Sequence, residues 1–130
     1  MDSTDRKILS ILVKDARSSN TAIAREIGVS EGTVRKRIAQ MVASGSIKGF
    51  TVIPGGETLV SIIMIKTDPE YSDEVLRKLR ERYPEVYEWS GIFDYSVRII
   101  AESLEAINRE VDAIRDIEGV VSTDTLIRLN

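Results

Sequence analysis

Three consecutive cations, Arg35, Lys36 and Arg37, are the side chains of this sequence that most directly suggest a chemistry. An Arg guanidinium can bind a phosphate or donate two hydrogen bonds to one guanine, and a Lys ammonium can bind a phosphate. A short basic run is often only a solvated helix face. The run therefore indicates a nucleic-acid contact only if the surrounding elements hold it firmly and present it outward.

The residues that are missing exclude several other chemistries. The chain contains no Cys and no His, which removes disulfides, thiolate nucleophiles, Cys/His zinc sites and His-based acid–base catalysis. Glu85 and Glu88 lie on an alternating segment with no nucleophile or phosphate-binding loop nearby, and we interpret them as surface charge. A site of carboxylates alone for Mg²⁺ or Ca²⁺ remains possible, but the sequence contains no EF-hand or P-loop pattern, so we expect no enzymatic activity, no cofactor and no metal site.

Charge is distributed unevenly along the chain. Residues 1–49 contain nine Lys and Arg against five Asp and Glu, whereas residues 50–130 contain nine against sixteen. A basic first part and an acidic second part suggest two modules with different partners. The longest apolar run, residues 62–65, is too short to cross a bilayer, so we expect a cytoplasmic protein without membrane contact.

Apolar residues at helical spacing predict three helices in the first module. The first covers residues 4–16 and would begin with Ser3 or Thr4 as its cap. The second covers residues 21–28 and ends with a Gly, and the third covers residues 31–43. Two helices joined by about three residues that include a Gly form a helix-turn-helix, whose second helix enters the DNA major groove.

The third predicted helix has the features that such a recognition helix requires. Val34, Ile38 and either Met41 or Val42 form an apolar stripe that would anchor it, so the basic run must spread over the flanks and the outer face. Its N-terminus, capped by Ser30, can hold a phosphate through backbone N–H groups. The sequence therefore predicts DNA binding. The candidate DNA-binding residues are Ser30, Glu31, Thr33, Arg35, Lys36, Arg37 and Lys48.

The second module alternates between strand and helix patterns. In chain order, the predicted elements are a strand at 59–67, a helix at 72–83 capped by Ser72, strands at 86–90 and 95–101, a helix at 104–117 and a strand at 120–129. This β-α-β-β-α-β order is that of the ferredoxin-like fold, so the chain is predicted to be α+β. A further short strand is predicted at residues 47–53, between the modules.

Five motifs in chain order resemble the Lrp/AsnC family, also called feast/famine regulatory proteins. DSTDRKIL with the following KDAR is similar to the family's opening helix, and AREIGVSEGTVRKRIAQM is similar to its helix-turn-helix. SGSIKGF resembles the link that leaves the DNA-binding domain, GIFD (residues 91–94) resembles the Gly-x-x-Asp motif of the effector domain, and EGVVSTDT resembles the last helix-to-strand passage. One departure is the segment FTVIPGGETLV, which is shorter than the family's usual connection.

The resemblance implies an N-terminal three-helix, winged-type helix-turn-helix and a C-terminal domain that responds to small effectors, usually amino acids. In such proteins the second domain pairs through its sheet into homodimers, which assemble into tetramers, octamers or rings. The partners implied are double-stranded DNA, an amino acid or similar effector, and further copies of the chain. The expected domains are the DNA-binding domain (1–49), a strand or hinge linker (50–57) and the effector-binding and oligomerisation domain (58–130).

The resemblance also places the effector near the Gly-x-x-Asp loop. Asp94 could receive the ammonium group of an amino acid while N–H groups of the turn receive its carboxylate, or it could simply cap the turn or hold a contact between dimers. The hydroxyls of the last strand could serve either end of the ligand, although Thr is common in strands for other reasons. The candidate effector-binding residues are Ser90, Gly91, Asp94, Ser122, Thr123 and Thr125.

Two functions remain open at this point. The first is a sequence-specific transcription regulator whose assembly or DNA affinity responds to an amino acid. The second is an architectural DNA-binding protein that uses its acidic module only to oligomerise and binds no ligand.

Overall fold

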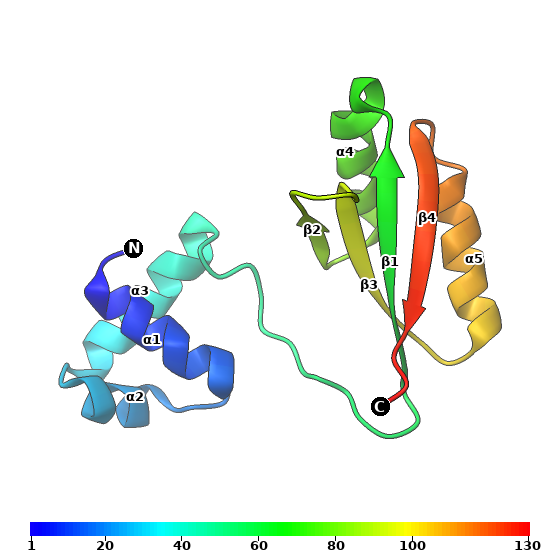
Figure 1. Cartoon of the computed structure of the whole chain (residues 1–130). Coiled ribbons are helices and arrows are strands. Elements are labelled where there is room, and N and C mark those ends of the chain that lie inside the picture. The colour runs from blue at the N-terminus through cyan, green and yellow to red at the C-terminus, as the bar shows by residue number, and fades with distance from the viewer. The chain divides into compact units, whose positions relative to one another are not determined.

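The computed structural model describes residues 1–130 and divides them into two units, Met1–Ile53 and Pro54–Asn130. The first unit contains helices only, and the second combines a sheet with helices (Figure 1). The junction between the units falls within the segment predicted as a linker, residues 50–57.

Three helices build the first unit: α1 (Ser3–Lys14), α2 (Asn20–Ile27) and α3 (Glu31–Ser44). Their apolar residues recur at helical spacing, so each helix presents one stripe to a common core. The buried residues of this core are Ile8, Leu12, Ile23, Ala24, Val34, Met41 and Ile47. The three predicted helices are confirmed, with ends that differ by two residues or fewer.

The cap of α1 differs from the prediction. The N-cap is Asp2, and not Ser3 or Thr4, because the Asp2 and Asp5 side chains each accept a hydrogen bond from the other's backbone N–H. The Asp2 carboxylate accepts the Asp5 N–H at 2.9 Å, and the Asp5 carboxylate accepts the Asp2 N–H at 3.3 Å. A cap at Ser3 would have Arg6 in the reciprocal position, and an Arg side chain cannot accept a hydrogen bond.

The strand predicted at residues 47–53 is absent. Residues 45–58 contain neither helix nor strand. Ile47 completes the helical core instead, and its N–H donates to the carbonyl of Met41 at 3.0 Å. A strand needs a neighbour to pair its backbone groups, and the first unit offers only helices.

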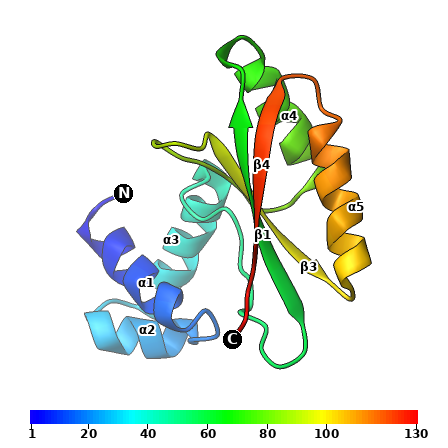
Figure 2. The ribbon, with the colours of Figure 1, turned by 45° about the vertical axis from the view of Figure 1, so that its right-hand side comes forward.

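One four-stranded antiparallel sheet, in the order β2-β3-β1-β4, forms the centre of the second unit. The elements of this unit are β1 (Leu59–Thr67), the single 3-10 turn η1 (Pro69–Tyr71), α4 (Ser72–Arg82), β2 (Val86–Glu88), β3 (Tyr95–Ala101), α5 (Leu104–Arg115) and β4 (Val120–Ile127). Figure 2 shows α4 and α5 on the same face of the sheet. This arrangement confirms the predicted ferredoxin-like fold.

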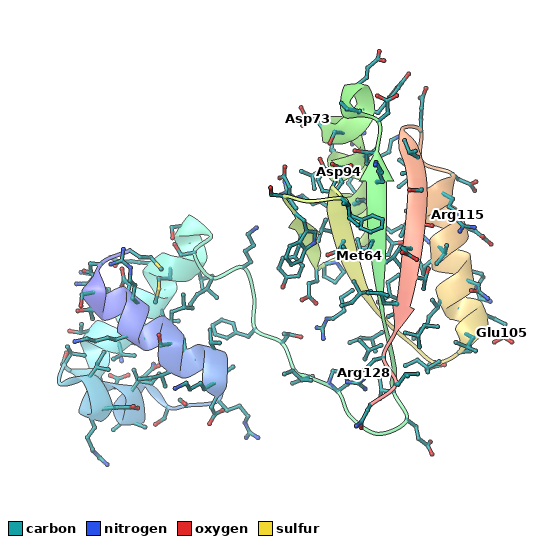
Figure 3. The ribbon with its side chains drawn as sticks, in the orientation of Figure 1. Met64, Asp73, Asp94, Glu105, Arg115 and Arg128 are labelled. Carbon is teal, nitrogen blue, oxygen red and sulfur yellow. The ribbon has the colours of Figure 1, made fainter.

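Side chains alternate between the two faces of the sheet. Ile63 and Ile65 of β1 are fully buried and pack with Leu79 of α4 and Ile114 of α5. Met64, between them, lies on the face that no helix covers (Figure 3). This face, which we call the open face, carries Ile62, Met64, Tyr87, Trp89, Ser96, Arg98 and Leu126.

The start of α4 also differs from the prediction. Ser72 does not cap the helix, because η1 runs directly into it and is itself capped by Asp68, whose carboxylate accepts the Glu70 N–H at 3.0 Å. The Ser72 hydroxyl lies 2.6 Å from the hydroxyl of Tyr95 and ties α4 to β3.

Candidate nucleic-acid interface and effector loop

The N-terminus of α3 is held by a polar cap. The Ser30 hydroxyl accepts the Thr33 N–H at 3.1 Å and lies 2.8 Å from the Thr33 hydroxyl. Helical geometry leaves the N–H groups of Glu31 and Gly32 without partners inside the helix. An exposed helix N-terminus with free N–H groups can bind a phosphate.

Lys36 and Arg35 point away from the core of the first unit. Lys36 is exposed and forms no ion pair. The Arg35 side chain is 66% exposed, and its Nη1 donates to both carboxylate oxygens of Glu31, at 2.9 and 2.7 Å. This pair is an exposed contact one helical turn long, which contributes little to stability and can open for another acceptor. Both cations are therefore free to approach a nucleic acid.

Arg37 has a different environment from its two neighbours. Its side chain is 33% exposed, and its Nη1 bonds to the carboxylates of Asp2 and Asp5 on α1, the latter at 3.4 Å. The pKa of Asp2 is lowered, first by the hydrogen bond from the Asp5 N–H and then by Arg37, and the pKa of Arg37 is raised. The structure thus gives Arg37 partners within the protein that the sequence did not indicate.

Lys48 is exposed, as expected, but lies in the irregular segment after α3 and not on a strand. Its position beyond the C-cap Gly45 leaves it outside the helix that holds the other candidates.

The loop between β2 and β3 is closed by backbone hydrogen bonds. The Trp89 N–H donates to the carbonyl of Asp94 at 2.9 Å, and the Asp94 N–H donates to the carbonyl of Ile65 at 2.9 Å. The indole N–H of Trp89 donates to the Ser96 hydroxyl at 2.7 Å. These bonds leave the loop residues between them, including Ser90 and Gly91, exposed.

Asp94 anchors this loop to the end of β1 (Figure 3). One carboxylate oxygen, Oδ2, accepts the Thr67 N–H at 2.8 Å and the Thr67 hydroxyl at 3.2 Å. The side chain is half-buried, and no Lys or Arg forms an ion pair with it. Asp94 therefore ties its loop to β1 through Thr67, which is a different role from capping its own turn, and its charge has no cationic partner within the chain.

The hydroxyls of β4 do not share one face of the sheet. Thr123 is paired with Ile65 and Thr125 with Ile63, so both point to the face that the helices cover. Ser122 is paired with Lys66 and points to the open face. Within a single chain, the three hydroxyls therefore do not line one site with the loop.

Thr123 also has a partner of its own and lies away from the loop. Arg115 lies on α5 (Figure 3). Its side chain donates to the Thr123 hydroxyl at 3.0 Å. Thr123 lies two strands from Tyr95, which is roughly 10 Å at the usual strand spacing. A ligand held by the loop of one chain would not reach Thr123 of the same chain.

Two hollows of the second unit were not indicated by the sequence. One, of about 420 Å³, lies on the open face between Ile62, Trp89 and Leu126. The other, of about 640 Å³, lies where the end of α4 meets β3 and the start of α5. In the second, Glu110 accepts bonds from Arg82 at 2.9 Å and from the Tyr83 hydroxyl at 2.6 Å, and burial with this bond raises the pKa of Tyr83 to about 12.

Two features are absent from the structure. The chain holds no group of three or more acidic side chains close enough to share a metal ion. None of its helices is both long and apolar enough to span a membrane.

The carboxylate of Glu85, which the sequence indicates as surface charge, pairs with Arg98 and accepts a hydrogen bond from the Tyr87 hydroxyl at 2.8 Å.

Comparisons with known proteins match both units. A family model for the AsnC-type helix-turn-helix domain matches residues 1–42, and one for the Lrp/AsnC ligand binding domain matches residues 60–130. The HTH-type transcriptional regulator LysM of Saccharolobus solfataricus is 38% identical over 133 residues, which cover 99% of this chain and 94% of LysM.

Solved structures agree with this result. Escherichia coli AsnC superposes with a TM-score of 0.63 at 27% identity, covering 100% of this chain and 93% of AsnC. The transcriptional regulator NMB0573 of Neisseria meningitidis, solved as a complex with L-Met, superposes with a TM-score of 0.64 at 19% identity, covering 100% of this chain and 90% of the other. At 19% identity, the comparison with NMB0573 shows a shared fold and nothing more.

Proposed function

The chain belongs to the Lrp/AsnC family of DNA-binding transcription regulators, and on this premise we propose that its assembly or DNA affinity responds to an amino acid. The family consists of regulators and not of enzymes, in agreement with the absence of Cys and His. The observation that most supports the proposal is the pairing of an exposed, cationic α3 in the first unit with a ligand-binding domain in the second.

The proposed DNA contact is the exposed N-terminal half of α3. The free N–H groups behind Ser30 would hold a phosphate, and Thr33 and Glu31 would lie at the base edges. Lys36 would bind a phosphate, and Arg35 would exchange Glu31 for a phosphate or a guanine. The exposed Lys48 would contact the flanking DNA backbone, as the sequence suggests.

The proposed effector site begins at the loop between β2 and β3. Exposed backbone around Ser90 and Gly91 is available for a carboxylate, and the half-buried charge of Asp94 is available for an ammonium group. The relative from Neisseria meningitidis was solved with L-Met bound, which supports an amino acid here. An effector of this class would be recognised through its two charged groups, which all amino acids share.

A second copy of the chain would complete this site. Within one chain, the loop and the hydroxyls of Ser122, Thr123 and Thr125 are separated by two strands or point to opposite faces. We propose that the chain forms a homodimer through the open face, whose Ile62, Trp89 and Leu126 are exposed. Dimers would then associate further and bring the loop of one close to another chain.

A ligand acts on such an assembly only through its different affinity for two states of it. A coupling free energy of about 1–3 kcal/mol, or roughly 5- to 150-fold in affinity, suffices for a regulatory response. Two-fold related heads would bind a pseudo-palindrome whose half-sites lie about one helical turn apart, or a multiple of it.

The experiment combines DNA binding with assembly. The purified protein is titrated onto a duplex from the promoter of its own gene, with and without each of the twenty amino acids, and its sedimentation is measured under the same conditions. We expect at least one amino acid to change the DNA affinity or the sedimentation coefficient. Unchanged values with all twenty would leave the ligand-independent architectural protein as the function.

A thermal-shift panel separates these two candidates at low cost. A ligand that binds only the folded state raises the melting temperature by an amount that grows with its concentration. The regulator predicts such a shift with one or a few amino acids, whereas the architectural protein predicts none.

A further inference from the structure

We infer that Arg37 is a positioning residue, which fixes the recognition helix α3 to the start of α1 through Asp2 and Asp5 and makes no contact with DNA. The inference rests on the proposed DNA contact by α3. It assigns the third cation of the basic run to the inside of the helix-turn-helix unit.

Four carboxylate oxygens form one network at this point. Asp2 uses Oδ1 and Asp5 uses Oδ2 for the reciprocal cap of α1. The other oxygen of each, Asp2 Oδ2 and Asp5 Oδ1, accepts a bond from Arg37 Nη1. The cap of α1 and the middle of α3 are therefore joined by a single guanidinium, across 32 and 35 positions in the sequence.

The position of Arg37 on α3 agrees with this role. Arg37 is three residues after Val34 and four before Met41, both buried, so it lies on the same side of the helix as the anchoring stripe. Its partner Asp5 is only 15% exposed, whereas the Arg35 side chain is 66% exposed. Lys36, one residue before Arg37, lies about 100° away from it round the helix and reaches the outer face.

Electrostatics oppose the transfer of Arg37 to a phosphate. If its guanidinium moved away, the carboxylates of Asp2 and Asp5 would lose the only cation that pairs with them. Two uncompensated negative charges would then lie beside the polyanion. Keeping the network closed avoids this cost and holds α3 at one orientation relative to α1.

The test uses a fluorescein-labelled duplex from the promoter of the protein's own gene, with fluorescence anisotropy measured at several salt concentrations. The variants are Arg37→Gln, Arg37→Lys, the pair Asp2→Asn with Asp5→Asn, and the triple variant that combines this pair with Arg37→Gln. An Asn side chain still accepts the backbone N–H groups at the start of α1, so the pair removes the charges and keeps the cap. Circular dichroism gives the melting temperature of each variant, and binding is measured well below it.

A positioning role predicts a particular combination of results. Arg37→Gln weakens binding about tenfold, which corresponds to about 1.4 kcal/mol, with an unchanged slope of log affinity against log salt concentration. The Asn pair weakens binding similarly, although it makes the protein less negative, and the triple variant is no weaker than Arg37→Gln. Arg37→Lys, which keeps the charge but not the fork geometry, is intermediate.

Three results would overturn the inference. A salt slope reduced by about one in Arg37→Gln, or tighter binding by the Asn pair, would make Arg37 a phosphate contact. Wild-type DNA affinity in Arg37→Gln and in the Asn pair would mean that the network contributes only to the stability of the fold and does not position α3 for DNA. A wild-type protein that binds neither this duplex nor one of mixed sequence would overturn the proposed function itself, and the inference with it.

Discussion

Adjacent residues of α3 occupy different environments because each turns about 100° from the last. Arg35 pairs along its own helix, Lys36 is free on the outer face, and Arg37 is tied to α1. A basic run in a helix is therefore not one positive patch. At this scale the number of cations is a poor guide to the number of DNA contacts.

Lys36→Ala tests the outward-facing cation. We expect weaker DNA binding to all sequences, with the slope of log affinity against log salt concentration reduced by about one, because one phosphate contact is lost. Anisotropy titrations at several salt concentrations give both quantities. The matched control is Arg80→Ala, which removes one exposed positive charge from α4 and should leave the slope unchanged. Equal slopes in the wild type and in Lys36→Ala would remove Lys36 from the interface.

Asp94→Asn separates the structural role of this residue from its charge. The amide oxygen of Asn can still accept the bonds from Thr67, so we expect nearly unchanged stability but at least tenfold weaker amino-acid binding, because the ammonium group loses its partner. Asp94→Ala should lose both the bonds from Thr67 and the amino-acid binding, with a fall of about 1–3 kcal/mol in the free energy of unfolding.

Calorimetry with the effector and chemical denaturation of both variants provide the measurements. If Asp94→Asn bound the amino acid as tightly as the wild type, Asp94 would only shape the loop, and backbone groups would have to bind the ligand.

At the scale of elements, hydrophobic spacing was sufficient to predict the helices and the sheet. The three helices of the first unit each carry one apolar stripe, and the strands of the second change to a period of two. The prediction of a strand at residues 47–53 was wrong, because the local sequence pattern does not reveal whether a partner strand exists. Local spacing determines an element's type, and pairing depends on distant parts of the chain.

The candidate sites were predicted less completely for the same reason. The exposure of Lys36 and the cap at Ser30 follow from residues within one helical turn. The contact between Arg37 and Asp2 joins residues 35 positions apart, and no local pattern indicates it. The separation of Ser122 from Thr123 follows from the alternation of a strand, and that rule was available from the sequence.

Gly119→Ala tests a close approach between elements. A Cβ at this position would lie 2.2 Å from the Cβ of Tyr71, and the backbone has a φ of +98°, which side chains disfavour. We expect a loss of about 3 kcal/mol or more in the free energy of unfolding, measured by urea denaturation. Gly55→Ala, which meets no atom within 4 Å, is the control and should change it by less than about 1 kcal/mol. Similar values for the two variants would contradict the packing of η1 against the start of β4.

At the scale of the whole molecule, the open face of the sheet is the feature that calls for a partner. Its Ile62, Trp89 and Leu126 are 39%, 51% and 55% exposed. Contiguous exposed apolar groups on a folded protein usually mark an interface. We therefore expect the second unit to determine the oligomeric state.

Leu126→Asp tests this expectation. A charge at the centre of a dimer interface would be buried without a partner, so we expect sedimentation to show a monomer with an unchanged circular dichroism spectrum. Leu104→Asp is the control, because Leu104 is 52% exposed at the start of α5, away from the open face. A Leu126→Asp variant that sediments like the wild type would place the interface elsewhere.

The irregular segment between the units limits how far each DNA-binding head can reach. Six residues separate Ile47, buried in the first unit, from Pro54, whose carbonyl accepts a bond from Arg128 in the second. Fully extended, six residues span about 20 Å. Two such tethers in a dimer together exceed the roughly 34 Å of one DNA turn. The avidity of a dimer for two half-sites would then depend on tether length through the effective concentration of the second head, which is greatest when the root-mean-square length of the tethers matches the span. Residues inserted here would change bivalent binding while leaving the affinity of one head for one half-site unchanged.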